Sequence, residues 1–90
     1  MKTGGLTPFL AALEALPQGS FTGHAQGRRY QILRQSFARG KAEKLVAYEL
    51  GGSDYISLNL YHLEAGPILK PCEMPVQKVI DFTCALTPDG

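Results

Sequence analysis

The chain has 90 residues, of which 44% are hydrophobic and 19% are charged, and its formal net charge is +1. These values exclude an intrinsically disordered chain and a coiled coil, and the length predicts a single domain, residues 1–90, with a thin core. Pro8, Glu14 and Pro17 interrupt the apolar stretch near the N-terminus, so we expect neither a signal peptide nor a membrane span, and therefore a cytoplasmic protein.

Charge is distributed unevenly along the chain. Residues 28–44 contain six Lys or Arg side chains and one Glu, a local charge of +5. Residues 45–90 contain two Lys side chains and six Asp or Glu side chains, a local charge of −4. We therefore expect a molecule with a basic side and an acidic side.

The first predicted element is a helix that opens at Thr7. The Thr7 hydroxyl can cap free backbone N–H groups, and Pro8 suits the first helical position because its missing N–H is not needed there. An apolar stripe follows at helical spacing, formed by Phe9, Leu10, Leu13 and Leu16. Pro17 and Gly19 end the helix.

The middle of the chain predicts an antiparallel meander. A weak first strand, residues 20–24, and a second strand, residues 28–37, flank the turn Gln26-Gly27, where glycine allows a positive φ. A basic turn, residues 38–42, leads to a third strand at 43–50. A second turn, residues 51–54, leads to a fourth strand at 54–63, and residues 68–70 are an optional fifth strand. We expect Asp54 to cap its turn through backbone N–H groups.

The fourth predicted strand alternates strictly between apolar and polar residues, which is typical of a half-buried strand. One face holds Ile56, Leu58 and Leu60. The other face holds Tyr55, Ser57, Asn59 and Tyr61, which the neighbouring strand extends with Gln31, Leu33 and Gln35. We expect the first set to point to the core and the second set to point away from it.

A second helix is expected after Pro75, with a wide apolar face formed by Val76, Val79, Ile80, Phe82, Cys84 and Leu86. The predicted fold is therefore an α+β two-layer sandwich: an N-terminal helix, an antiparallel meander of four strands (three or five being the alternatives) and a C-terminal helix. Both helices would cover one face of the sheet and leave the other face open.

The open sheet face and the basic hairpin together indicate a non-enzymatic binding module. The predicted binding residues are Arg28, Arg29, Arg34, Tyr55, Asn59 and Tyr61. A protein or peptide partner, or a second copy of the chain, is favoured over nucleic acid, which the basic segment and tyrosines also suit. Gly23 weakens the first strand and predicts a poorly protected sheet edge that could pair with another chain.

The alternative interpretation is a small thiol-dependent enzyme that uses Cys72 with His62 or His24. Cys72 precedes a predicted helix N-terminus, where the helix dipole favours a thiolate. Cys72 and Cys84 are separated by about 12 residues of mostly helical chain, roughly 18 Å, so no disulfide is expected. The short paired Cys and His spacings of zinc sites are absent, and we expect neither a metal nor a cofactor.

The order of elements is similar to that of the double-stranded RNA-binding domain. That family has a Lys-Lys-x-Ala-Lys type cluster at the start of its last helix. Residues 73–78 read Glu-Met-Pro-Val-Gln-Lys, with one lysine and one carboxylate. The resemblance therefore covers the order of elements alone and implies no site residue.

Overall fold

The computed structural model describes residues 6–89. Its helices are α1 (Thr7–Glu14), the 3-10 turn η2 (Ala38–Gly40) and α2 (Val76–Ala85). Its strands are β1 (Gly19–Ala25), β2 (Arg28–Phe37), β3 (Ala42–Glu49), β4 (Tyr55–Leu63), β5 (Gly66–Pro71) and β6 (Thr87–Pro88). The predicted α+β class is confirmed, whereas the expectation of four strands is wrong because the described residues form six.

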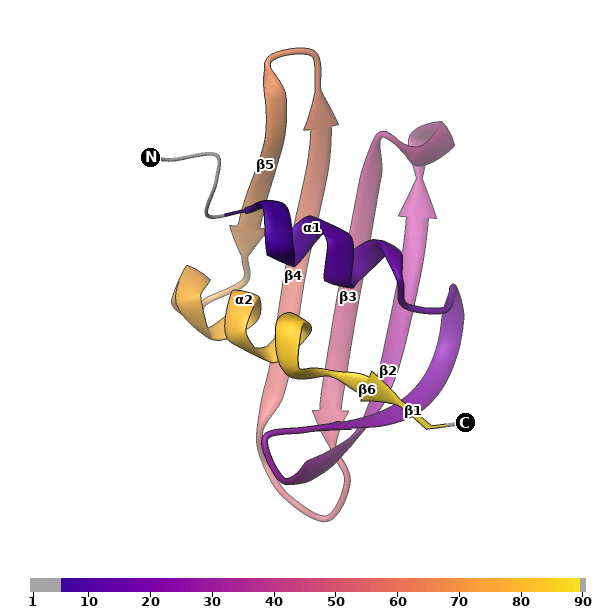
Figure 1. Ribbon diagram of the computed structural model, residues 1–90, viewed down its shortest axis with the longest axis vertical. Helices are drawn as coiled ribbons and strands as arrows, with labels where there is room; N and C mark the ends of the chain where they lie inside the picture. The colour runs from indigo at the N-terminus through magenta and orange to yellow at the C-terminus, as the bar shows by residue number, and fades with distance from the viewer. Residues whose placement is uncertain (1–5, 90) are drawn as a thin grey trace.

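The six strands form one antiparallel sheet in the order β5-β4-β3-β2-β1-β6. Consecutive strands from β1 to β5 are neighbours, so this part of the sheet is the expected meander. Both helices lie on the same face of the sheet and cross its strands obliquely (Figure 1). The opposite face, which we call the outer face, therefore has no helix over it.

The strand that sequence reasoning missed is β6. It pairs with β1, with Pro88 opposite Gly23 and Thr87 opposite His24. A Cβ atom built on Gly23 would lie 2.8 Å from the Thr87 carbonyl oxygen, so glycine is needed for this close approach. A two-residue strand has no periodicity of its own, and Gly23 alone indicated only a weak strand.

The helix starts differ slightly from their predictions. Leu6, not Thr7, occupies the N-cap of α1 and makes no side-chain capping hydrogen bond. Pro75 occupies the N-cap of α2 rather than its first helical position. Between Gln26 and Gly27 the expected turn is present, and both residues have a positive φ. Within residues 6–89, no helix is long and apolar enough to cross a membrane.

The core lies between the helices and the inner face of the sheet. The predicted inward residues of β4 are buried, with Ile56 1% exposed and Leu58 and Leu60 0% exposed. They belong to one hydrophobic cluster with side chains of both helices, including Phe9, Leu13, Val79 and Phe82. Tyr30 of β2 contacts the Phe82 ring edge-on at 4.8 Å between centroids. The face assignment of the sheet is therefore confirmed.

Candidate functional site

The strand register determines which side chains share the outer face. Lys44 on β3, Asn59 on β4 and Lys70 on β5 are directly opposite one another and form one row. Tyr48 is opposite Tyr55, and these two rings are stacked with 6.4 Å between their centroids. Within this sheet, the outward positions of β2 to β5 carry no carboxylate.

The outer face also holds most of the exposed hydrophobic surface. Seven of the nine large hydrophobic side chains that are exposed among residues 6–89 occupy outward positions of these strands. They are Leu33, Phe37, Tyr48, Tyr55, Tyr61, Leu63 and Ile68. Contiguous exposed apolar groups of this kind mark interaction surfaces in soluble proteins.

The cations of the described residues fall into two groups. Four of them contact a carboxylate: Arg28, Arg29, Arg34 and Lys78. The other four make no ion pair with a residue in 6–89: Arg39, Lys41, Lys44 and Lys70. Lys44 and Lys70 lie on the outer face, and Arg39 and Lys41 lie at the connection between β2 and β3. Two of the four unpaired cations therefore lie on the outer face, and the other two lie at the end of the sheet where β2 and β3 are joined.

The acidic side chains that make no ion pair within residues 6–89 are mainly in the helices or next to them. Glu14 belongs to α1, Asp81 belongs to α2, and Glu73 precedes α2. Glu64, in the turn between β4 and β5, is the exception. The segregation of charge that composition suggested is thus a difference between the outer face and the helical layer.

Of the six predicted binding residues, the structure brings Tyr55, Asn59 and Tyr61 together on the outer face. Arg29 also lies on this side, at the edge, where its Nη2 is 2.6 Å from Oδ2 of Asp89. This hydrogen bond, with one from the Thr22 hydroxyl, lowers the pKa of Asp89. Arg29 is therefore already paired within the chain.

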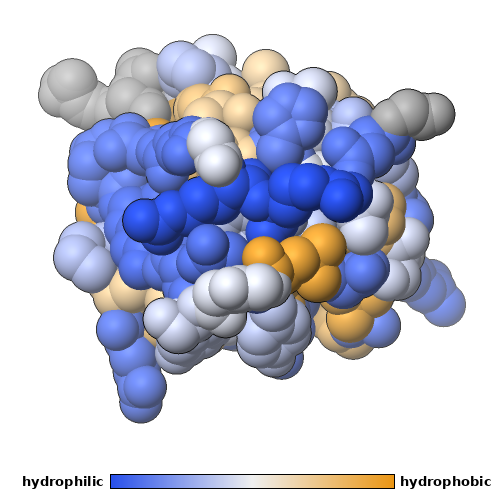
Figure 2. Space-filling view, turned by 90° about the horizontal axis from the view of Figure 1, so that it is seen from below, coloured by the Kyte–Doolittle hydropathy of each residue, from blue (hydrophilic) through white to orange (hydrophobic). Residues whose placement is uncertain are grey.

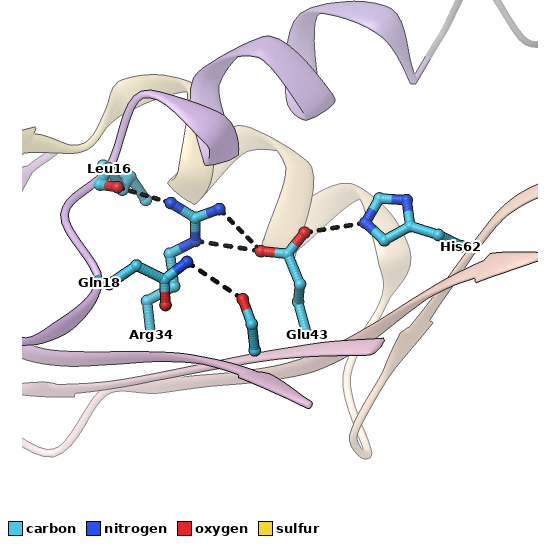
Figure 3. Close-up of polar contacts among 6 residues, drawn as sticks. Leu16, Gln18, Arg34, Glu43 and His62 are labelled. Carbon is cyan, nitrogen blue, oxygen red and sulfur yellow. Dashed lines mark hydrogen bonds and ion pairs between the residues drawn. The ribbon is translucent and has the colours of Figure 1, made fainter. Parts of the chain in front are cut away.

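Arg34, one of the six predicted binding residues, is not on the outer face. Arg34 lies on the inner face of the sheet and is 7% exposed, and its guanidinium Nε and Nη2 donate hydrogen bonds to Oε1 of Glu43 at 3.1 and 2.8 Å (Figure 3). Its Nη1 donates to the carbonyl oxygen of Leu16 at 2.6 Å. Glu43 Oε2 is 2.8 Å from Nε2 of His62. This cluster joins the end of α1 to the sheet.

Two opposing effects determine the pKa of Glu43. Burial raises it, whereas the hydrogen bonds from His62 and Arg34 and the charge of Arg34 lower it. The hydrogen bonds and the charge prevail, and the pKa of Glu43 lies below its usual value. Glu43 is therefore held as a carboxylate between its two partners.

Arg28 and Asp54 belong to a second cluster, at the opposite end of the sheet. Asp54 accepts hydrogen bonds from the Tyr30 hydroxyl and from Nζ of Lys78, both at 2.9 Å, and Arg28 lies 3.8 Å away. The Lys78 hydrogen bond is the main reason that the pKa of Asp54 is lowered. The predicted capping role of Asp54 is wrong, since its carboxylate connects β2 to α2.

The surface at the end of the sheet that holds the Asp54 cluster is mainly hydrophilic, with a small hydrophobic patch (Figure 2).

The structure does not bring Cys72 together with either histidine. The thiol is on the outer face, where the Asn59 side-chain amide approaches its sulfur at 3.6 Å. His62 lies on the inner face with Glu43, and His24 lies at the far edge beside Asp89. Cys72 and Cys84 are both free thiols. Because the sheet separates Cys72 from His62, the thiol–histidine pair of the enzyme interpretation is not assembled.

The two edges of the sheet differ in how much backbone they leave open for strand pairing, and at the β1 edge Gly23 itself is covered by β6. On β5, the backbone N–H of Cys72 donates to Ser57, so the alternation of an antiparallel pair directs residues 67, 69 and 71 away from β4. Pro67 and Pro71 have no N–H, which leaves only Leu69 as a donor at this edge. At the other edge, β6 covers part of β1.

Sequence reasoning missed several residues of the outer face, among them Tyr48, Lys44 and Lys70. The signal was present in strand alternation, since residues 44, 46 and 48 alternate with the inward residues once β3 is paired with β4.

Within residues 6–89 there is no enclosed pocket and no group of three or more potential metal ligands. No family model matches this chain, and neither a curated protein nor a solved structure is significantly similar to it.

Proposed function

We propose that this chain is a non-enzymatic binding module that takes its partner on the outer face of the sheet. One observation carries the proposal: exposed aromatic side chains and unpaired lysines occupy the same face, and no carboxylate accompanies them on β2 to β5. Lone exposed apolar residues are ordinary, but a shared face of rings and free cations is a surface suited to recognition.

The other surfaces of the sheet are less suited to a partner. The helices cover the inner face, and its charged residues Arg34 and Glu43 satisfy each other. Prolines at β5 remove backbone donors from one edge and β6 covers part of β1 at the other, which leaves little backbone for pairing with an extended peptide. The outer face is the broad surface that remains.

The positive charge of the outer face favours an anionic partner. In a face-to-face dimer, Lys44 and Lys70 of each copy would meet outward positions of β2 to β5 that carry no carboxylate, and such like-charge contacts are unfavourable. Self-association through this face is therefore disfavoured, although sequence alone left it open. An anionic partner, either an acidic protein segment or a nucleic acid, complements both lysines.

Chromatography on a heparin column, a simple polyanion, tests the proposed surface. The outer-face variant is Lys44→Gln combined with Lys70→Gln, and the matched control is Ala11→Glu combined with Ala85→Glu on exposed helix positions. Both variants lower the net charge by the same amount. We expect the wild type and the control to elute at similar salt and the outer-face variant to elute earlier. Equal shifts in both variants would show that net charge, rather than this face, governs binding.

A further inference from the structure

We propose that the partner of the outer face is a single-stranded nucleic acid that lies along β4. This inference rests on the binding function proposed above and specifies the class of its ligand. It is carried by the order of side chains along the strand: a pair of aromatic rings, a row with two lysines, and a third aromatic ring. Proteins that bind single strands combine these two elements, since bases stack on rings and cations track the phosphates.

The aromatic positions are exposed and well separated. Tyr48 and Tyr55 are 60% and 40% exposed, and their planes are inclined by 19° to each other. Tyr61 is 36% exposed and lies six residues beyond Tyr55 on the same strand. At about 3.4 Å per residue, roughly 20 Å separates Tyr55 from Tyr61. A flexible strand can place different bases on the two sites.

The lysines lie between the aromatic positions. Lys44 and Lys70 are on either side of Asn59, which is four residues after Tyr55 and two before Tyr61. Two strand spacings of about 4.8 Å each place their Cα atoms roughly 10 Å apart across β4. A phosphate backbone that follows β4 would thus have a cation on each side.

The positive charge continues beyond Tyr61. Ala42 is opposite Tyr61, and the connection from β2 carries Lys41 one residue before Ala42 and Arg39 three residues before it. These two side chains are exposed and make no ion pair within the described part of the chain. Arg39 and Lys41 therefore place further positive charge at the end of the sheet beyond Tyr61.

An acidic protein segment would use the same lysines but would need the tyrosines only as apolar contacts. Leucine supplies apolar bulk without a ring, so Tyr→Leu changes distinguish the two ligands. A duplex hides the faces of its bases by stacking, and the outer face has no element that enters a groove. The ring requirement and the preference for single strands are therefore the two specific consequences of the proposal.

The test measures fluorescence anisotropy of a labelled oligothymidylate of about 12 nucleotides at low salt. A duplex of equal length and polyglutamate serve as competitors. Because the chain has no Trp, quenching of its Tyr emission is an independent readout of the outer face, which carries three of the four tyrosines. We expect the single strand to bind best and to quench this emission.

Single variants at the tyrosines and the double lysine variant complete the test. Tyr55→Leu and Tyr61→Leu should each weaken binding of the single strand by about 5- to 150-fold, the range for one stacked base. Lys44→Gln with Lys70→Gln should reduce the slope of log K against log salt by about 1.4. Val76→Ala, an exposed apolar change on α2, is the control and should bind as the wild type does.

The outcomes separate this inference from the proposed function. If polyglutamate competes as well as the single strand and both Tyr→Leu variants bind normally, while the lysine variant is weakened, the nucleic-acid inference is overturned and the binding face remains. If the single strand, the duplex and polyglutamate all fail to bind at low salt, both proposals are overturned. Thermal melts of each variant confirm that the comparison is made between folded proteins.

Discussion

Removing the acceptor of the buried Arg34 guanidinium should destabilise the protein strongly. Arg34 and Glu43 side chains are each 8% exposed, so solvent screens their interaction little. Glu43→Leu leaves the guanidinium with only the Leu16 carbonyl oxygen, 2.6 Å from Nη1. Breaking one side of such a pair costs about 3–5 kcal/mol, a large part of the roughly 5–13 kcal/mol expected for a domain of this length.

Replacing both partners should cost much less. In the double variant Arg34→Met with Glu43→Leu no charge remains buried, and the main loss is the hydrogen bond to Leu16, about 1 kcal/mol. His62, whose side chain is 36% exposed, can return to water when Glu43 is removed. The double variant should therefore be more stable than Glu43→Leu alone.

Urea unfolding followed by circular dichroism measures these differences. The same loss of stability corresponds, at about 4–8 °C for each kcal/mol, to a Tm of Glu43→Leu that is lower by about 12 °C or more. Glu14→Leu on exposed α1 is the control, and its free energy of unfolding should change by less than about 0.5 kcal/mol. A double variant as unstable as Glu43→Leu would refute the argument that an unpaired buried charge causes the loss.

Three further predictions concern the rest of the fold. Gly23→Ala should displace the Thr87 carbonyl and cost about 1–3 kcal/mol, with faster hydrogen exchange in β1 and β6 but not in β4. Thr83→Val should leave the free energy of unfolding unchanged or raise it by up to about 1 kcal/mol in a denaturant titration, because the buried Thr83 hydroxyl has no hydrogen-bond partner among residues 6–89. The pKa of Asp54 is lowered, mainly by the Lys78 hydrogen bond. The stability that this carboxylate contributes is therefore present above the unfolded-state pKa of about 3.8 and is lost as pH falls through the folded-state value. In an acid titration, Asp54→Asn should lose stability less steeply than the wild type.

Local alternation was sufficient to predict the class of fold and the buried face of β4. The period of two that separates Ile56, Leu58 and Leu60 from Tyr55 and Tyr61 arises from strand geometry alone. Helical spacing likewise indicated the apolar faces of α1 and α2. These features depend on neighbours in the sequence, so no tertiary information was needed to find them.

Part of the candidate site was also within reach of the sequence. Tyr55, Asn59 and Tyr61 were placed on the outer face correctly. The same alternation that places Gln31, Leu33 and Gln35 outward on β2 places Arg34 inward, whereas its charge is typical of an exposed residue. Arginine is seldom buried without a partner, and the partner became visible only when β3 placed Glu43 beside it.

A half-buried antiparallel sheet packed against two helices follows from the sequence pattern, because periodicity shows which side of each element avoids water. Which charges remain free depends instead on the folded arrangement. Segments distant in the chain supply the acceptors that neutralise Arg28, Arg29, Arg34 and Lys78, and none reaches Lys44 or Lys70 among the described residues. Ion pairing depends on distance in space, which a local count of charges does not contain.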